Sequence, residues 1–331
     1  MYDPLRVPNA ELYNRICAYA GQWRGGKIGD YDTARHLLTH PQDFTSTYGT
    51  GPGPVEKKAD FLSLNLSDPP EHGALRRTVS AWLKERWEAC GVDLELQTAK
   101  RLATAGPDVL ADIARPLPWV VLQALLQIPE AAQAEIYGCV QNIASHHSWK
   151  ESEERLLDLL VQNPMGPLVG TDGAYLVRLL LLAGWASTSA AIANLLMHLA
   201  EGECGKLEEF IEESLRFASP ISQFSRQVTR TLELGNTHLQ TGDRVTVLFP
   251  AVNRDPKHFH EPDEFRPGRS CPHLAFGAGP HQCLGADIAR AQLRWVLQGV
   301  MKRGGLKIVH QSPTRSAFAL GPGELRVAWN T

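Results

Sequence analysis

The sequence predicts a mainly α-helical protein with a minor β region near its C-terminal half. Apolar residues recur at helical spacing in successive segments between residues 71 and 217, which is typical of packed helices. Alternating and β-branched patterns follow only after this part, separated by turn-prone residues. Neither a repeat of fixed period nor a low-complexity linker divides the 331 residues. We therefore expect residues 1–331 to form a single domain.

Prolines and apolar periodicity mark where the helices should begin and end. Asp68-Pro69-Pro70 suits the start of a helix at residue 71, and Pro129 should end the apolar helix over residues 116–127. In chain order we expect helices over residues 71–84, 94–105, 116–127, 130–143, 149–162, 174–200 and 206–217. The longest apolar stretch lies in the sixth of these helices, where arginine, serine, threonine, asparagine and histidine interrupt it. It is therefore predicted to lie inside a protein and not in a bilayer.

The character of the chain changes after residue 217. Strands are predicted over residues 228–234 and 243–249, where β-branched or alternating patterns occur between turn-prone residues. Loops rich in proline, aspartate and glycine should run from residue 253 to residue 285. A last long helix over 287–301 and a final strand over 325–329 complete the predicted β-containing part.

Composition excludes several classes of function. With 43% hydrophobic and 21% charged residues and a net charge of −3, the chain lacks the basic excess of a nucleic-acid-binding protein. Residues 1–20 contain no basic stretch followed by an apolar run, so we expect no signal peptide. The six cysteines are widely spaced and form no Cys-x-x-Cys pair: Cys17, Cys90, Cys139, Cys204, Cys271 and Cys283. This spacing argues against a disulfide framework and against a zinc site. The chain is predicted to be a reduced, cytoplasmic protein without nucleic-acid or membrane partners.

A glycine-rich loop around one cysteine is the most informative segment. Residues 276–285 read Phe-Gly-Ala-Gly-Pro-His-Gln-Cys-Leu-Gly, directly before the last predicted helix. Gly277, Gly279 and Gly285 permit backbone angles or close approaches that a Cβ would prevent. A cysteine at a helix N-terminus meets free N–H groups that favour a thiolate, the form in which it can ligate a haem iron. The alternative is a buried structural cysteine in a glycine-rich turn.

This loop, with the pattern Phe-x-x-Gly-x-x-x-Cys-x-Gly, resembles the haem loop of cytochromes P450. The resemblance implies a trimmed cytochrome P450 fold that binds haem b between the long helix and the cysteine loop. Cys283 would be the proximal iron ligand, with Phe276, Gly277 and Gly285 also contacting the cofactor. The segment Glu213-Ser214-Leu215-Arg216 resembles the family's Glu-x-x-Arg pair, and Arg269 stands where the family has a second arginine.

Four further residues resemble the family's ligands of the haem propionates. His72 and Arg76 lie four residues apart on the helix that follows Asp68-Pro69-Pro70, so they share one face. Arg226 and His273 match two later positions, and together the four would supply donors for two carboxylates. Taken singly, each is more often a solvated surface residue.

The long helix departs from the family pattern at its functional positions. The family's Ala-Gly-x-(Asp/Glu)-Thr is replaced by Ala183-Gly184-Trp185-Ala186-Ser187. By resemblance, Gly184 with Ala183 would make room for oxygen, and Ser187 would supply the distal hydrogen bond. The proton-relaying acid is missing at Ala186, so protons would come from water, from substrate or from Thr188.

Several functions stay open at this stage. The first is a biosynthetic monooxygenase that uses O₂ and electrons from a ferredoxin-type donor to hydroxylate, couple, desaturate or cyclise a small natural-product intermediate. The second is a haem-thiolate enzyme outside the usual O₂ cycle: a peroxygenase, a nitric-oxide reductase or a dehydratase or isomerase. The third is a non-catalytic haem protein, suggested by a chain shorter than is usual for the family. An electron donor could dock on the basic residues of the expected proximal helix, Arg76, Arg77, Lys84 and Arg86. The substrate pocket should be lined largely by apolar residues: Leu179, Leu182, Ile221 to Phe224 and Phe318.

Overall fold

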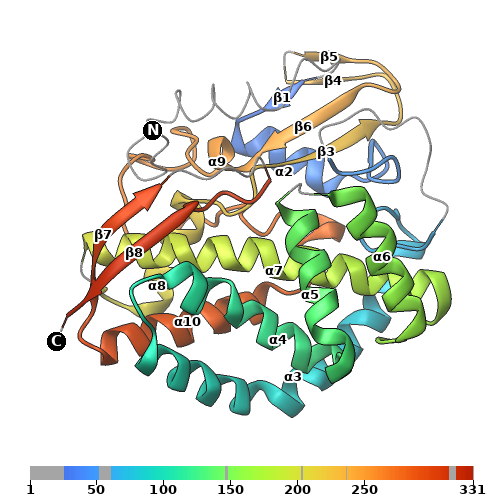
Figure 1. The fold of residues 1–331 in the computed structure, drawn as a ribbon. Helices are drawn as coiled ribbons and strands as arrows, with labels where there is room; N and C mark the ends of the chain where they lie inside the picture. The colour runs from blue at the N-terminus through green and yellow to red at the C-terminus, as the bar shows by residue number, and fades with distance from the viewer. Residues whose placement is uncertain are drawn as a thin grey trace.

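The structure is a computed structural model that describes residues 26–51, 61–145, 148–202, 204–235, 237–312 and 318–330. Cys17 and the segment 1–20, for which no signal peptide is expected, lie outside the described residues. Figure 1 shows a helical part below and a small sheet above, with a separate two-stranded sheet at one side. The mainly α-helical class with a minor β region is thus confirmed.

Helix α7, Gly170–Glu201, runs through the middle of the helical part (Figure 1). It contacts five other helices and the short π-helix Leu110–Ala114, and most of its residues beyond Thr188 are buried. Its neighbours are α4 (Pro116–Leu126), α5 (Glu130–Ala144), α6 (Trp149–Gln162), α8 (Leu207–Phe217) and α10 (Ala286–Lys302). These helices start and end within a few residues of their predicted bounds, because prolines and apolar periodicity mark them clearly.

By length and composition alone, residues 170–200 of α7 are apolar enough to cross a membrane. Within the most apolar window of this segment, 61% of the residues are buried inside the protein. Apolar residues of its first half pack in one cluster with α4, α5 and α6, and those of its second half pack in another with α4, α8 and α10. The prediction that this helix lies in a protein core is therefore confirmed.

The prediction of two helices over 71–84 and 94–105 is wrong. A single helix, α3, runs from Glu71 to Thr104. Gly91 lies between the two predicted helices, and a glycine inside a helix costs only about 1 kcal/mol relative to alanine. Trp87 covers this position, since a Cβ on Gly91 would lie 3.6 Å from its ring, and Trp87 stacks on Trp295 of α10. Packing against α10 thus keeps the helix continuous.

The strand predicted over 228–234 is also wrong in its bounds. Strand β3, Gln223–Val228, pairs antiparallel with β6, Arg244–Leu248, and β4, Leu232–Leu234, belongs to a separate hairpin with β5, Thr237–Leu239. The main sheet has the order β1-β6-β3-β2, with β1 at Lys27–Ile28 and β2 at Phe44–Thr45. Strand β3 is buried on both sides, so it lacks the alternation that sequence reasoning relied upon.

Four further elements complete the fold. Helix α2, Tyr31–Thr39, is capped by the Asp30 carboxylate, which accepts from the Thr33 N–H at 2.9 Å. The short helix α9, Phe249–Val252, follows β6 directly. Strand β7, Leu306–Ser312, which the sequence analysis missed, pairs antiparallel with β8, Glu324–Trp329. The β7–β8 hairpin lies against one end of α7 (Figure 1).

Candidate haem-thiolate site

The cysteine loop has a fixed backbone shape that depends on two glycines. Gly277 and Gly279 have φ of 68° and 69°, which favour glycine, and a Cβ on Gly279 would lie 2.5 Å from the Leu38 carbonyl oxygen. The Cys283 N–H donates to the Phe276 carbonyl at 2.8 Å and closes the loop. Gly285 differs from the prediction, because it has an ordinary φ of −92° and nothing within 4 Å of a Cβ position.

Opposing influences act on the Cys283 thiol. Its side chain is accessible, yet burial among protein atoms raises the pKa of its thiol. A hydrogen bond from the Gly285 backbone and the charges of Arg76 and Arg290 act in the opposite direction and favour the thiolate. Helix α10 begins only three residues later, so its free N–H groups face the same region. The neighbouring Leu284 packs in an apolar cluster with Leu176 of α7, which brings the cysteine loop to the long helix.

Three of the four residues predicted for the propionates belong to one group. His72 is buried and its Nε2 has no hydrogen-bond partner among the described residues. Burial and the charges of Arg76 and Arg226 lower its pKa. Arg226 is itself buried, its Nη1 donates to its neighbour's carbonyl at 2.9 Å, and burial lowers its pKa to about 10. A buried guanidinium and an unpaired imidazole nitrogen are donors that a carboxylate ligand would satisfy.

The structure does not bring His273 to this group. Its Nε2 lies 3.1 Å from Glu212 Oε2, and its Nδ1 accepts the Ala275 N–H at 3.1 Å, so both ring nitrogens are already used. His281 lies beside His72, with the ring centroids 4.2 Å apart, and its own ring nitrogens lie 3.1 Å from the Leu64 carbonyl and 3.3 Å from Ser46 Oγ. Burial, together with the charge of Arg226, lowers the pKa of His281 to about 3. Sequence reasoning missed His281 although it stands two residues before Cys283 in the same motif.

The accessible face of α7 carries Ala183 and Ser187, one helical turn apart. The Ser187 hydroxyl donates to the Ala183 carbonyl at 2.5 Å. Gly184 packs against α4, since a Cβ there would lie 3.1 Å from Leu122 Cδ2. Close helix packing therefore gives Gly184 a structural reason that the sequence analysis did not foresee. Ala186 carries no titratable group, and it packs beside the apolar cluster between α7 and α4–α6.

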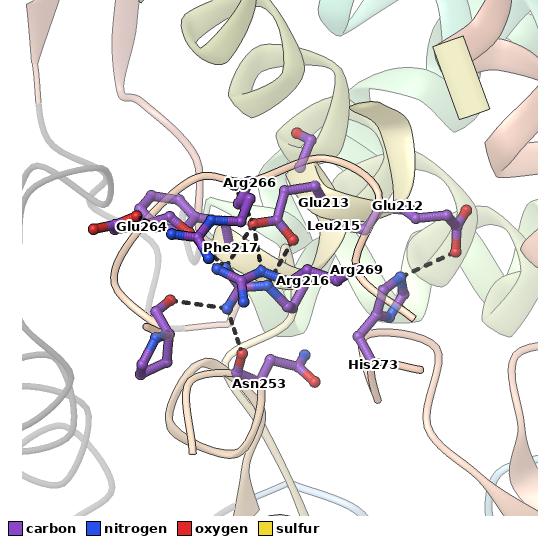
Figure 2. Close-up of polar contacts among 12 residues, drawn as sticks. Glu212, Glu213, Leu215, Arg216, Phe217, Asn253, Glu264, Arg266, Arg269 and His273 are labelled. Atoms are coloured by element: carbon purple, nitrogen blue, oxygen red, sulfur yellow. Dashed lines mark hydrogen bonds and ion pairs between the residues drawn. The ribbon is translucent and has the colours of Figure 1, made fainter. Parts of the chain in front are cut away.

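Behind the site, α8 carries the predicted Glu-x-x-Arg pair. Glu213 binds Arg216 through both carboxylate oxygens, at 2.7 and 2.8 Å, and Arg269 Nε lies 3.1 Å from Glu213 Oε1. Arg216 also donates to the carbonyls of Asn253 and Pro262 (Figure 2). This confirms the expected pairing and joins α8 to the segment 253–269 that precedes the cysteine loop.

These residues fit a haem with two propionates. The orphaned His72 Nε2, the buried Arg226 and Arg76 supply donors for carboxylates, and Cys283 supplies an accessible sulfur beside them. A Cβ on Gly277 would meet no atom within 4 Å, so the backbone there is open to a flat ligand. Within the ranges that the structure describes, no group of three or more His, Cys, Asp or Glu could hold a metal ion by itself.

Comparison with known proteins gives one consistent family. The family model "Cytochrome P450" matches residues 206–323. A 20-oxo-5-O-mycaminosyltylactone 23-monooxygenase of Streptomyces fradiae is 30% identical, over 94% of this chain and 86% of the relative. Cyclomarin C epoxidase CymV of Salinispora arenicola is 29% identical, over 83% of each chain.

Solved structures agree with the sequence relatives. HmtN, a post-tailoring hydroxylase of himastatin biosynthesis, is 26% identical with a TM-score of 0.76, covering 92% of this chain and 90% of that one. CYP109E1 of Bacillus megaterium shares the fold with a TM-score of 0.81 at 22% identity, covering 98% and 100% of the two chains. The chain is therefore a haem-iron oxidoreductase that belongs to the cytochrome P450 family.

Proposed function

We propose that Cys283 is the proximal ligand of a haem b iron and that the chain oxidises a small natural-product intermediate. The accessible Cys283 sulfur, at the start of α10 and beside the donors His72 and Arg226, is the observation that carries this proposal. His72, Arg76 and Arg226 would hold the two propionates. Phe276, Gly277 and Gly285 would form part of the surface that contacts the haem macrocycle.

The distal side would be formed by the accessible face of α7. The bound haem iron supplies activation of dioxygen for insertion into a substrate C–H or C=C bond. Ser187 Oγ holds a proton one turn from Ala183 and can turn from the Ala183 carbonyl to a ligand on that face. Ala183 leaves space, and Gly184 sets how closely α7 approaches α4. Because Ala186 cannot carry a proton, ordered water or a substrate hydroxyl has to deliver it.

The substrate class follows from the relatives. One is named a monooxygenase of a mycaminosyltylactone and another a cyclomarin epoxidase, so oxidation of a natural-product intermediate suits this chain. Ile221, Phe224 of β3 and Phe318 would form a largely apolar pocket wall, and the Phe224 and Phe318 rings lie 5.8 Å apart. Ser222 and Gln223 are the neighbouring polar groups that could orient such a substrate.

Electrons would come from a ferredoxin-type partner. Arg77 and Lys84 are exposed on α3, Arg76 and Arg86 are partly buried there, and Arg76 is the member that acts on Cys283. A basic helix face next to the thiolate suits an acidic redox protein, whose encounter it would accelerate at low salt. We place this reaction in the cytoplasm.

The first test is the carbon monoxide difference spectrum of the reduced protein. Wild type should give the red-shifted Soret band of a thiolate complex, and Cys283→Ala should lose it. Cys271→Ala, which removes another accessible cysteine, is the matched control and should behave as wild type. A wild-type spectrum without this band, or one that Cys283→Ala leaves unchanged, would overturn the assignment.

A second measurement separates the two modes of oxidation. The missing acid at Ala186 favours an oxidant that needs fewer delivered protons, so the protein is assayed with a ferredoxin system and, separately, with peroxide. Turnover with the ferredoxin system supports the monooxygenase. Turnover with peroxide, without any turnover in the ferredoxin system, would show that the protein is a peroxygenase with the same haem site.

A further inference from the structure

An arginine of α10 stacks on the aromatic ring of the cysteine loop. The guanidinium carbon of Arg290 lies 4.6 Å from the centroid of the Phe276 ring, a distance typical of a cation–π contact. The Phe276 carbonyl accepts the Cys283 N–H at 2.8 Å, so the ring and the cysteine belong to one closed loop. A fixed positive charge is thus held at the loop that carries the sulfur.

Glu212 of α8 holds this arginine in place. Arg290 Nε lies 2.7 Å from Glu212 Oε1 and Nη2 lies 2.9 Å from Oε2, which is bidentate geometry. His273 Nε2 lies 3.1 Å from Oε2 of the same carboxylate (Figure 2). Because the guanidinium is clamped by two oxygens and one ring face, it cannot swing into solvent without breaking all three contacts.

We propose that the Glu212–Arg290 pair is a positioning device that fixes a positive charge on the Phe276 ring of the loop that carries Cys283. This inference rests on the proposed role of Cys283 as the iron ligand. A positive charge held at the haem loop stabilises the more reduced, more negative state of the bound haem, so it raises the reduction potential. Arg290 acts through Cys283 and Phe276 and needs no contact with substrate.

Electrostatics at Cys283 agree with the geometry. Burial raises the pKa of the thiol, and the Arg290 charge is among the influences that lower it. Asp287 of α10 acts in the opposite direction, and its carboxylate lies 3.6 Å from Arg290 Nη1. Arg76 of α3 is the other cation that acts on the sulfur, so removal of Arg290 leaves one positive charge of the two.

An ordinary surface ion pair is the competing explanation, and the chain offers a matched control for it. Arg294, one turn further along α10, binds Glu208 with the same bidentate distances of 2.7 and 2.9 Å. Glu208 lies one turn before Glu212 on α8, so both pairs join the same two helices. What distinguishes Arg290 is its contact with the Phe276 ring of the cysteine loop.

The test compares Arg290→Gln, Arg290→Lys and Arg294→Gln in the haem-loaded protein. We measure the reduction potential by spectroelectrochemical titration and the rate at which the carbon monoxide complex loses its red-shifted band. Arg290→Gln should have a more negative potential and lose the band several-fold faster, whereas Arg294→Gln should match wild type. Arg290→Lys should recover part of both effects because it keeps the charge but not the bidentate clamp.

The outcomes are distinguishable from failure of the haem assignment. If wild type itself lacks the red-shifted band, the proposed function fails. If wild type has the band but Arg290→Gln and Arg294→Gln have equal potentials and equal rates, only the present inference fails. Should Arg290→Gln bind haem poorly, Glu212→Gln, which removes the carboxylate that holds Arg290, is measured in its place, and a potential and a rate equal to those of Arg294→Gln would overturn the proposal. High salt should reduce the difference, since the pair is partly exposed.

Discussion

Glu212 and Glu213 are neighbours on α8, and each binds an arginine through both of its oxygens, but their surroundings differ. The side chains of Glu213 and Arg216 are 2% and 1% exposed, whereas those of Glu212 and Arg290 are 41% and 31% exposed. Figure 2 shows Arg216 and Arg269 converging on Glu213 while Glu212 points away towards His273. The same ion-pair chemistry therefore serves two purposes: one pair holds the fold together and the other acts on the cysteine loop.

The helix geometry of α8 explains the division. Successive residues of a helix point about 100° apart, so Glu213 faces the segment 253–269 and Glu212 faces α10. Arg216 adds bonds to the carbonyls of Asn253, Pro262 and Glu264. With these bonds every donor of the buried guanidinium meets an acceptor, which is the condition for a buried charge to be tolerated.

The largest effect is expected from breaking the buried pair. Glu213→Leu leaves Arg216 and the nearby Arg269 without their carboxylate, and removing one partner of a buried ion pair costs about 3–5 kcal/mol. Urea unfolding followed by far-ultraviolet circular dichroism should show this loss, or the variant should fail to accumulate as soluble protein. A loss below about 1 kcal/mol would contradict a structural role for the pair.

A smaller, pH-dependent effect is expected at Glu212. Burial would raise the pKa of this carboxyl, but the hydrogen bonds from Arg290 and His273 prevail and lower it from 4.5 to about 2. A lowered folded-state pKa gives stability that is present above the unfolded-state value and is lost as pH falls through the folded-state value. The advantage of wild type over Glu212→Gln should thus be constant above about pH 5 and vanish between pH 4.5 and 2.

The size of that advantage is limited by exposure. Because both side chains are partly solvated, we expect about 1 kcal/mol or less. Unfolding of both proteins at pH 6, 4 and 3 measures it, with Glu208→Gln as the control for a pair that does not touch His273. A difference between wild type and Glu212→Gln that grows as the solution is acidified would show that the sign is wrong.

The sequence was informative where function restricts several residues at once. The cysteine loop, the Glu213–Arg216 pair and the bounds of α5 and α6 could all be read from motifs and periodicity. The role of His273 could not, because sequence shows that a histidine is present but not which partner, Glu212 or a propionate, its ring meets. Continuity of α3 likewise depends on a tertiary contact, the stacking of Trp87 on Trp295. Neither contact can be predicted from the spacing of motifs along the chain.

The smallest effect is expected at the pair that resembles Glu212–Arg290 most closely. Arg294 and Glu208 are 38% and 61% exposed, and their bidentate geometry equals that of the Arg290 pair. Exposed ion pairs contribute between zero and about 1 kcal/mol, so Arg294→Gln should change the free energy of unfolding by less than about 0.5 kcal/mol. Urea unfolding at neutral pH tests this. A loss as large as that of Glu213→Leu would mean that the α8–α10 contact itself depends on these pairs, and position beside Phe276 would then no longer distinguish Arg290 from its neighbour.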